Sequence, residues 1–185
     1  MEDKTIVDLF WARSENAIAE TDKKYGRYCR SIAHNILSNE EDAEECVNDT
    51  WLGAWNSIPP HRPAVLSTFL GKLTRRISLN RWKAQHAQKR GGGEIAIALE
   101  ELSEIVPASG GVEEDLEGKE LSAAINVFLS TLPEAERDMF VCRYWFLTSI
   151  TDLSRLFRFS QSKTKSTLYR TREKLKRFLS EEGFL

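Results

Sequence analysis

The hydrophobic residues of this chain recur at intervals of three and four over most of its length, which is the spacing of helices that bury one face. In the first half of the chain this pattern predicts helices over residues 14–37, 38–57 and 66–89. Ser14 is a suitable N-cap for the first helix, and Ser38 with Glu41 matches a capping box at the start of the second. A proline pair that begins at Pro59 ends the second helix.

A second helical set is predicted over residues 120–130, 133–146, 151–157 and 160–180. Pro133 suits the first position of its helix, where its missing N–H needs no partner. No strand-type alternation stands out, so the predicted fold class is all-α, with small helical domains at residues 1–90 and 119–185. Residues 91–118 are acidic and contain glycine, and we expect a flexible linker there, although Ile95 and Leu99 suggest that it docks somewhere.

Composition limits the class of protein. The 185 residues, 41% hydrophobic and 29% charged, suffice for a packed core and exclude a collagen-like or disordered chain. No run approaches the roughly 20 apolar residues that cross a bilayer, and the first residues lack a signal-peptide pattern. Three widely spaced cysteines indicate neither a disulfide framework nor a zinc site. We therefore expect a cytoplasmic protein without membrane insertion.

The net charge of −2 conceals blocks of opposite sign. Residues 38–50 hold six acids and no base, and residues 51–93 hold eight bases and no acid. Residues 94–120 hold nine acids and one base, and residues 153–178 hold nine bases and one acid. Each block alone could be a solvated helix face. Two separate basic stretches can nevertheless bind a polyanion, so the low net charge does not exclude nucleic acid as a partner.

The predicted helix 66–89 has an apolar face and a basic face. On a helical wheel, Leu66, Phe69 and Leu73 fall on the apolar side. The opposite side carries a group of bases and one indole ring, among them Lys72, Arg75, Arg76, Trp82 and Lys83. Bases around an aromatic ring are typical of a surface that follows a phosphate backbone and stacks on nucleic-acid bases. Trp82 could equally pack against a neighbouring helix.

The last two predicted helices have the spacing of a helix-turn-helix motif. The first half of the second helix, which meets base edges in such motifs, carries Lys163, Ser166, Thr167 and Arg170. The residues expected to hold phosphates are Arg155, Arg158, Lys165 and Arg172. A basic helix could also be a solvated bundle face or lie on a membrane, but its apolar stripe is narrow for a membrane helix.

The second predicted helix carries an acidic stripe formed by Asp42, Glu45 and Asp49. We favour a protein-docking stripe, with Trp51 and Trp55 as aromatic anchors beside it. The alternative for both tryptophans is the hydrophobic core, and for at least one of them we expect it.

Catalysis is disfavoured by the surroundings of these acids. The only histidine near them in sequence is His34, and no glycine-rich loop that could form a ligand pocket is present. Cys29 lies on an apolar stripe, where a thiol usually acts as a small hydrophobic side chain. We therefore predict a protein that is not an enzyme and has no metal or cofactor.

The order of these segments resembles that of bacterial RNA polymerase sigma factors. The run DAEECVNDTWLGAW, residues 42–55, resembles the conserved helix of sigma region two, and residues 69–83 resemble the helix that follows it. The Leu-Pro-Glu run at residues 132–134 and residues 151–176 resemble region four. With regions two and four only, the chain is similar to the extracytoplasmic-function (ECF) group.

The resemblance implies a dissociable subunit that gives core RNA polymerase its choice of promoter. It implies that core polymerase is bound by Asp42, Glu45, Asp49, Trp51 and Trp55. It implies that the −10 promoter element, as duplex and when melted, is met by Arg62, Lys72, Arg75, Arg76, Trp82 and Lys83. It implies that the −35 element is met by Arg155, Lys163, Lys165, Ser166, Thr167 and Arg170. By the same resemblance, the acidic linker would lie in the path of nascent RNA, and an anti-sigma protein is an expected partner.

A few positions depart from the family pattern. Arg158 stands where the turn of the motif usually has glycine, and Thr164 stands where an apolar residue is usual. Arg76, Asn80 and Thr167 also replace residues that are common at their positions. These departures bear on the promoter sequence rather than on the class of protein.

Two other classes of protein fit the residues less completely. A stand-alone helix-turn-helix regulator would explain residues 119–180 but would leave the acidic stripe and the basic third helix without a role. A helical adaptor that binds only proteins would leave both basic faces unexplained.

Overall fold

The computed structural model describes residues 1–86, 93–106 and 114–185, and every regular element within these ranges is an α-helix. The predicted all-α fold class is thereby confirmed. The chain divides into two compact units, Met1–Arg90 and Gly91–Leu185. None of the helices in the described ranges is long and apolar enough to cross a membrane.

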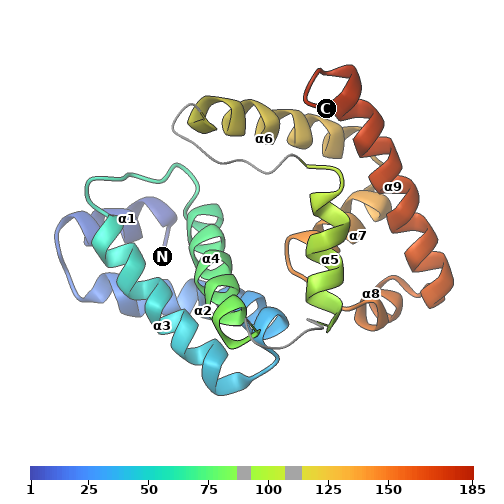
Figure 1. Cartoon of the computed structure of the whole chain (residues 1–185). Coiled ribbons are helices and arrows are strands. Elements are labelled where there is room, and N and C mark those ends of the chain that lie inside the picture. The colour runs from blue at the N-terminus through green and yellow to red at the C-terminus, as the bar shows by residue number, and fades with distance from the viewer. Residues whose placement is uncertain (87–92, 107–113) are drawn as a thin grey trace. The chain divides into compact units, whose positions relative to one another are not determined.

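The first unit is built around α2 (Figure 1). Its helices are α1 (Asp3–Trp11), α2 (Asn16–Leu37), α3 (Glu40–Ser57) and α4 (Leu66–His86). Helix α2 packs against the other three, and α3 also packs against α4. Buried side chains from all four helices form the core, among them Phe10, Cys29, Trp51 and Leu70. Burial raises the pKa of the Cys29 thiol to about 11, so this sulfur is not a thiolate near neutral pH.

The helix ends in this unit differ in part from the prediction. Helix α1 was not predicted, although Ile6 and Phe10 are spaced as on one helical face and both are fully buried. The N-cap of α3 is Asn39, whose side chain accepts a hydrogen bond from the backbone N–H of Asp42. The predicted cap, Ser38, instead closes α2 in a left-handed conformation with φ 53°.

The second unit contains the helix-turn-helix motif. Its helices are α5 (Gly93–Ser103), α6 (Glu114–Thr131), α7 (Glu134–Tyr144), α8 (Ile150–Phe157) and α9 (Gln161–Glu181). Helix α9 packs against α6, α7 and α8, and its buried face includes Leu168, Leu175 and Leu179. Pro133 is the N-cap of α7 rather than its first residue.

Helix α5 lies within the range expected to be a flexible linker. It packs against α7, and Ala98 at its centre is only 1% exposed. The apolar residues of this stretch are therefore part of a helix that belongs to the second unit. Residues 87–92 and 107–113 of the expected linker lie outside the described residues.

Candidate nucleic-acid and protein interfaces

The acidic stripe of α3 faces α4 at its N-terminal end. One guanidinium nitrogen of Arg81 lies 2.6 Å from a carboxylate oxygen of Asp42 and 2.6 Å from one of Glu45. The Gln85 amide also donates to Asp42, at 3.1 Å. Asp49 is exposed, and no ion pair involves it in the described part of the chain. The stripe therefore has an internally paired end and an open end.

The pairing stabilises the charged forms of Glu45 and Arg81. The hydrogen bond from Arg81 lowers the pKa of Glu45, and the same bond raises the pKa of Arg81 further above its usual value. Sequence reasoning missed Arg81, because no local pattern connects it to acids 36 and 39 residues away in the chain. This bridge links α3 to α4, the two helices that carry all candidate residues of the first unit except Arg62.

The two tryptophans beside the acidic stripe differ in exposure. Trp51 is 5% exposed and belongs to the core, the alternative that the sequence left open. Trp55 is half-buried, and its ring meets Phe10 edge-on with the centroids 6.3 Å apart. The Arg13 guanidinium lies 5.3 Å from the Trp55 ring centroid and donates a hydrogen bond to the Trp55 carbonyl at 2.6 Å. Both indoles thus have intramolecular packing partners.

The basic face of α4 is only partly open to solvent. Lys72, Arg76 and Lys83 are exposed, whereas Trp82 is half-buried. Arg75 is also half-buried, and this burial lowers the pKa of its guanidinium. The three exposed cations lie on the polar side of the helix, where a phosphate backbone could reach them.

Arg62 in the loop before α4 is attached to α1. Its guanidinium forms an ion pair with Asp8 and lies 5.5 Å from the centroid of the Trp11 ring. About half of the Arg62 side chain remains exposed. The contacts hold the loop against α1 and leave part of the cation at the surface.

The turn between α8 and α9 has no glycine. Arg158 itself adopts the left-handed conformation, with φ 55° and ψ 39°, and its N–H bonds back to the carbonyl of Arg155 at 3.3 Å. Ser160 then caps α9 by accepting a hydrogen bond from the N–H of Lys163 at 3.2 Å. The usual glycine is therefore replaced by an exposed arginine in the same backbone conformation.

Thr164 also has a structural explanation. Its hydroxyl lies 3.0 Å from the hydroxyl of Ser154 on α8, and both groups are buried. Each hydroxyl also lies within 3.1 Å of the carbonyl oxygen four residues earlier in the chain. Since each hydroxyl has a single proton, one of them donates to its carbonyl while the other donates across the pair. A polar pair thus joins the two helices of the motif at a position where an apolar residue is usual.

The face of α9 opposite this pair is open and basic. Lys163, Lys165, Ser166 and Arg170 are exposed, and Thr167 is half-buried. Lys165, Ser166 and Arg170 line a shallow surface depression together with Tyr169. Tyr169 was not singled out from the sequence, although it is one turn after Lys165 and is 56% exposed. On α8, Arg155 forms an exposed ion pair with Asp152 at 3.2 Å.

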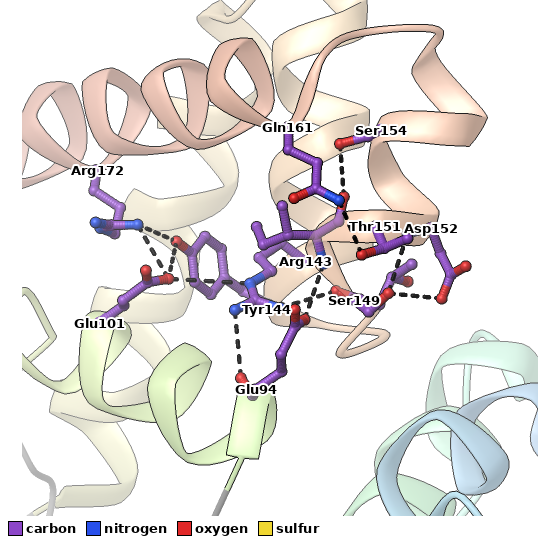
Figure 2. A network of polar contacts seen from close by, with 12 residues as sticks. Glu94, Glu101, Arg143, Tyr144, Ser149, Thr151, Asp152, Ser154, Gln161 and Arg172 are labelled. Carbon is purple, nitrogen blue, oxygen red and sulfur yellow. Dashed lines mark hydrogen bonds and ion pairs between the residues drawn. The ribbon is translucent and has the colours of Figure 1, made fainter.

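Arg172 differs from the other bases of α9, since it points into the unit rather than to solvent. It was expected to hold a phosphate, but its side chain is 13% exposed and forms an ion pair with Glu101 of α5 at 3.1 Å. It also donates a hydrogen bond to the Tyr144 hydroxyl at 2.6 Å. These contacts form part of the polar network in Figure 2.

Within the described ranges, no group of three or more His, Cys, Asp or Glu side chains could hold a metal ion. The candidate surfaces are the acidic stripe of α3, the basic face of α4 and the basic face of α9 in the helix-turn-helix motif. Together with the all-helical fold, they are typical of a helical DNA-binding protein.

Comparisons with known protein families agree with this class. The family described as sigma-70 region 2 matches residues 22–88, and the family described as ECF sigma factor matches residues 62–181. The second match covers more than half of the chain. A comparison of the chain with curated proteins found no match. The chain therefore belongs to the ECF sigma factor family, whose members direct transcription initiation.

Membership of this family implies two classes of binding partner. Sigma factors bind core RNA polymerase and promoter DNA, and they are in general regulators rather than enzymes. The predicted family and function are thereby confirmed, and no observation favours the stand-alone regulator.

Proposed function

We propose that the two units of this sigma factor bind different partners. Residues 1–90 bind core polymerase and the −10 element, and residues 119–185 bind the −35 element. The observation that carries this proposal is the exposed basic face on a helix of each unit, α4 and α9. Two linked DNA-binding units engage the second element at a raised effective concentration once the first is bound.

In the first unit, we infer that the open end of the acidic stripe docks on core polymerase. Asp49 is the centre of this contact because it is exposed and outside the Arg81 bridge. Glu45 contributes from its exposed side, Asp42 is held by Arg81, and Trp51 supports the helix from the core. Trp55 contributes through the part of its ring that remains at the surface.

For the −10 element, we infer contacts from one face of α4 and the loop before it. Lys72, Arg76 and Lys83 supply phosphate contacts, while Arg75, Trp82 and the exposed part of Arg62 lie at the edges of this surface. Melting costs base unstacking, which is partly repaid where exposed bases find an aromatic or polar surface. Core polymerase contributes the remaining free energy.

For the −35 element, we infer that the exposed face of α9 enters the major groove. Lys163, Lys165, Ser166 and Arg170 meet DNA first because they are exposed near the N-terminus of α9, and Thr167 lies at the edge of this surface. Arg155 contributes a phosphate contact from α8. We also infer an anti-sigma protein as a regulatory partner, action in the cytoplasm and no catalytic activity of the chain's own.

The experiment that tests the proposal is run-off transcription with purified core polymerase on a promoter library with both elements randomised. We expect specific initiation only when the chain is present, with enrichment of sequence at both elements. A stand-alone regulator would bind duplex DNA without core polymerase and would not support initiation. That result would overturn the proposal.

A matched pair of variants tests the docking stripe. Asp49→Lys should weaken core binding at least about tenfold, since it reverses a charge at the centre of the contact. Glu44→Lys makes the same charge change on an exposed residue that the helical wheel places on the other side of α3. It should leave core affinity nearly unchanged. Equal effects of the two variants on core binding would contradict the assignment.

A further inference from the structure

Helix α5 carries two carboxylates that face the helix-turn-helix motif. Glu94 and Glu101 are two helical turns apart, so they lie on one face of α5. Both belong to a stretch expected to be a linker, and nothing assigned so far gives them a role. Figure 2 shows both side chains pointing from α5 toward residues of α7, α8 and α9.

Glu94 fastens the junction between α7 and α8. One of its carboxylate oxygens accepts a hydrogen bond from Arg143 of α7 at 3.1 Å and another from the backbone N–H of Ile150 at 2.9 Å. Ile150 is the first residue of α8, so Glu94 satisfies an amide that the helix itself leaves unpaired. Arg143 also donates to the carbonyl of Thr148 in the connection between the helices.

Glu101 joins α7 to α9. Its carboxylate accepts a hydrogen bond from the Tyr144 hydroxyl at 2.9 Å and pairs with Arg172 at 3.1 Å. Arg172 in turn donates to the same hydroxyl at 2.6 Å. Burial raises the pKa of Tyr144 to about 12, so this hydroxyl keeps its proton for the bond to Glu101. Helix α9 is thus tied to α7 through a residue of α5.

The burial of Arg143 makes these carboxylates necessary. Its side chain is 2% exposed, and its ion-pair partners in the described part of the chain are Glu94 and Glu101. The Arg143 Nε atom has no hydrogen bond there and lies 4.0 Å from Glu101. A buried cation that loses its counter-charges is strongly unfavourable, so the docked α5 stabilises this arrangement of α7 and α8.

We propose that Glu94 and Glu101 are positioning residues for recognition of the −35 element. They hold the start of α8 and the middle of α9 in one arrangement, so the DNA-reading unit begins at α5 rather than at α6. The inference rests on the proposed reading of the −35 element by α9. It also makes a prediction of unusual sign, because removal of an acid should strengthen DNA binding if only the overall charge mattered.

The test uses holoenzyme assembled from the full chain and core RNA polymerase. A duplex selected by wild-type holoenzyme from a library randomised over the −35 region serves as the cognate probe. A duplex with that region shuffled serves as the control probe. The variants are Glu94→Gln, Glu94→Ala and Glu94→Gln combined with Glu101→Gln, and circular dichroism checks folding at the assay temperature.

We expect the double variant to bind the cognate duplex about tenfold more weakly, the scale of one lost base contact, and to bind the shuffled duplex at least as well as wild type. Glu94→Gln keeps an acceptor for Ile150 and should lose less affinity than Glu94→Ala. Phe128→Leu, a core change on α6 away from this network, is the control for lower stability alone. It should retain discrimination between the two duplexes.

Unchanged or tighter cognate binding by the double variant would overturn the inference, as would an equal loss of discrimination in Phe128→Leu. If the double variant does not fold, Tyr144→Phe decides, because it removes one donor to Glu101 and one acceptor for Arg172 but keeps the ring. Tyr144→Phe should lower the affinity for the cognate duplex but not for the shuffled duplex. An unchanged affinity for the cognate duplex would overturn the inference. Failure of wild-type holoenzyme to enrich any −35 sequence would instead refute the proposed function.

Discussion

Replacement of Arg158 by glycine should stabilise the second unit. Arg158 is exposed and adopts the left-handed conformation at the C-cap of α8, with φ 55°. A Cβ atom in this conformation costs roughly 1–2 kcal/mol, whereas glycine loses about 0.4–1 kcal/mol through the greater entropy of its unfolded state. The net gain expected for Arg158→Gly is therefore about 0.5–1 kcal/mol. In a unit of this size that corresponds to a rise in Tm of about 2–8 °C.

Scanning calorimetry of the full chain can measure this shift, because it can resolve separate transitions of the two units. Arg158→Ala is the matched control, since it removes the same charge but keeps the Cβ atom. Leu147 offers a contrast, because it has the same backbone conformation, φ 54°, but is 4% exposed. Leu147→Gly should destabilise the unit, because lost burial of about 1.5–3 kcal/mol exceeds the relief of strain. If Arg158→Gly is no more stable than Arg158→Ala, the argument from backbone strain is wrong.

Three further predictions follow from the helix pairs and the recognition face. Ser154→Ala and Thr164→Val should each lower the free energy of unfolding. Urea unfolding of the two single variants and the double variant should give an interaction free energy of about 1 kcal/mol between the two positions. Additive losses would contradict the buried hydroxyl pair. Because the pKa of Glu45 is lowered in the fold, the contribution of its ion pair with Arg81 to the free energy of unfolding should be present above about pH 4.3 and lost as the pH falls through the folded pKa. Urea midpoints measured between about pH 3 and 6 should show this dependence in the wild type and a flatter one in Arg81→Gln. Identical profiles of the two proteins would refute the bridge. Arg170→Ala should weaken cognate −35 binding by about 1–3 kcal/mol and relax its specificity, while Arg177→Ala, two turns further along α9, should weaken all duplexes alike; a uniform loss in both variants would make Arg170 a phosphate contact.

The sequence correctly predicted which side of a helix is exposed where the periodicity of its apolar residues is clear. The exposed side of α9 carries Lys163, Ser166 and Arg170 as its periodicity indicates, since a buried apolar stripe leaves only one face for solvent. The same reasoning failed at Ser38, where a capping box suits the residues but Asn39 is the cap. Two adjacent residues competed for that role, and the left-handed end of α2 determined which one starts α3.

The candidate interfaces were less predictable from sequence than the helices. Trp51 and Asp49 lie two residues apart, yet one belongs to the core and the other to the surface. Arg172 has the spacing of a phosphate contact on α9, but Tyr144 and Glu101 draw it into the unit. No local signal could separate it from Arg170, because the difference comes from helices more than 25 residues away in the chain.

The sequence by itself determined the helical class, the division of charge along the chain and the family, because periodicity and motif order are properties of neighbouring residues. Only the tertiary structure decided which charges are available to partners. Arg81 pairs with Asp42 and Arg143 pairs with Glu94 because packing brings together residues that the sequence separates by 39 and 49 positions. For Arg143, whose side chain is 2% exposed, burial makes the counter-charge important, since an unpaired cation removed from water is strongly unfavourable.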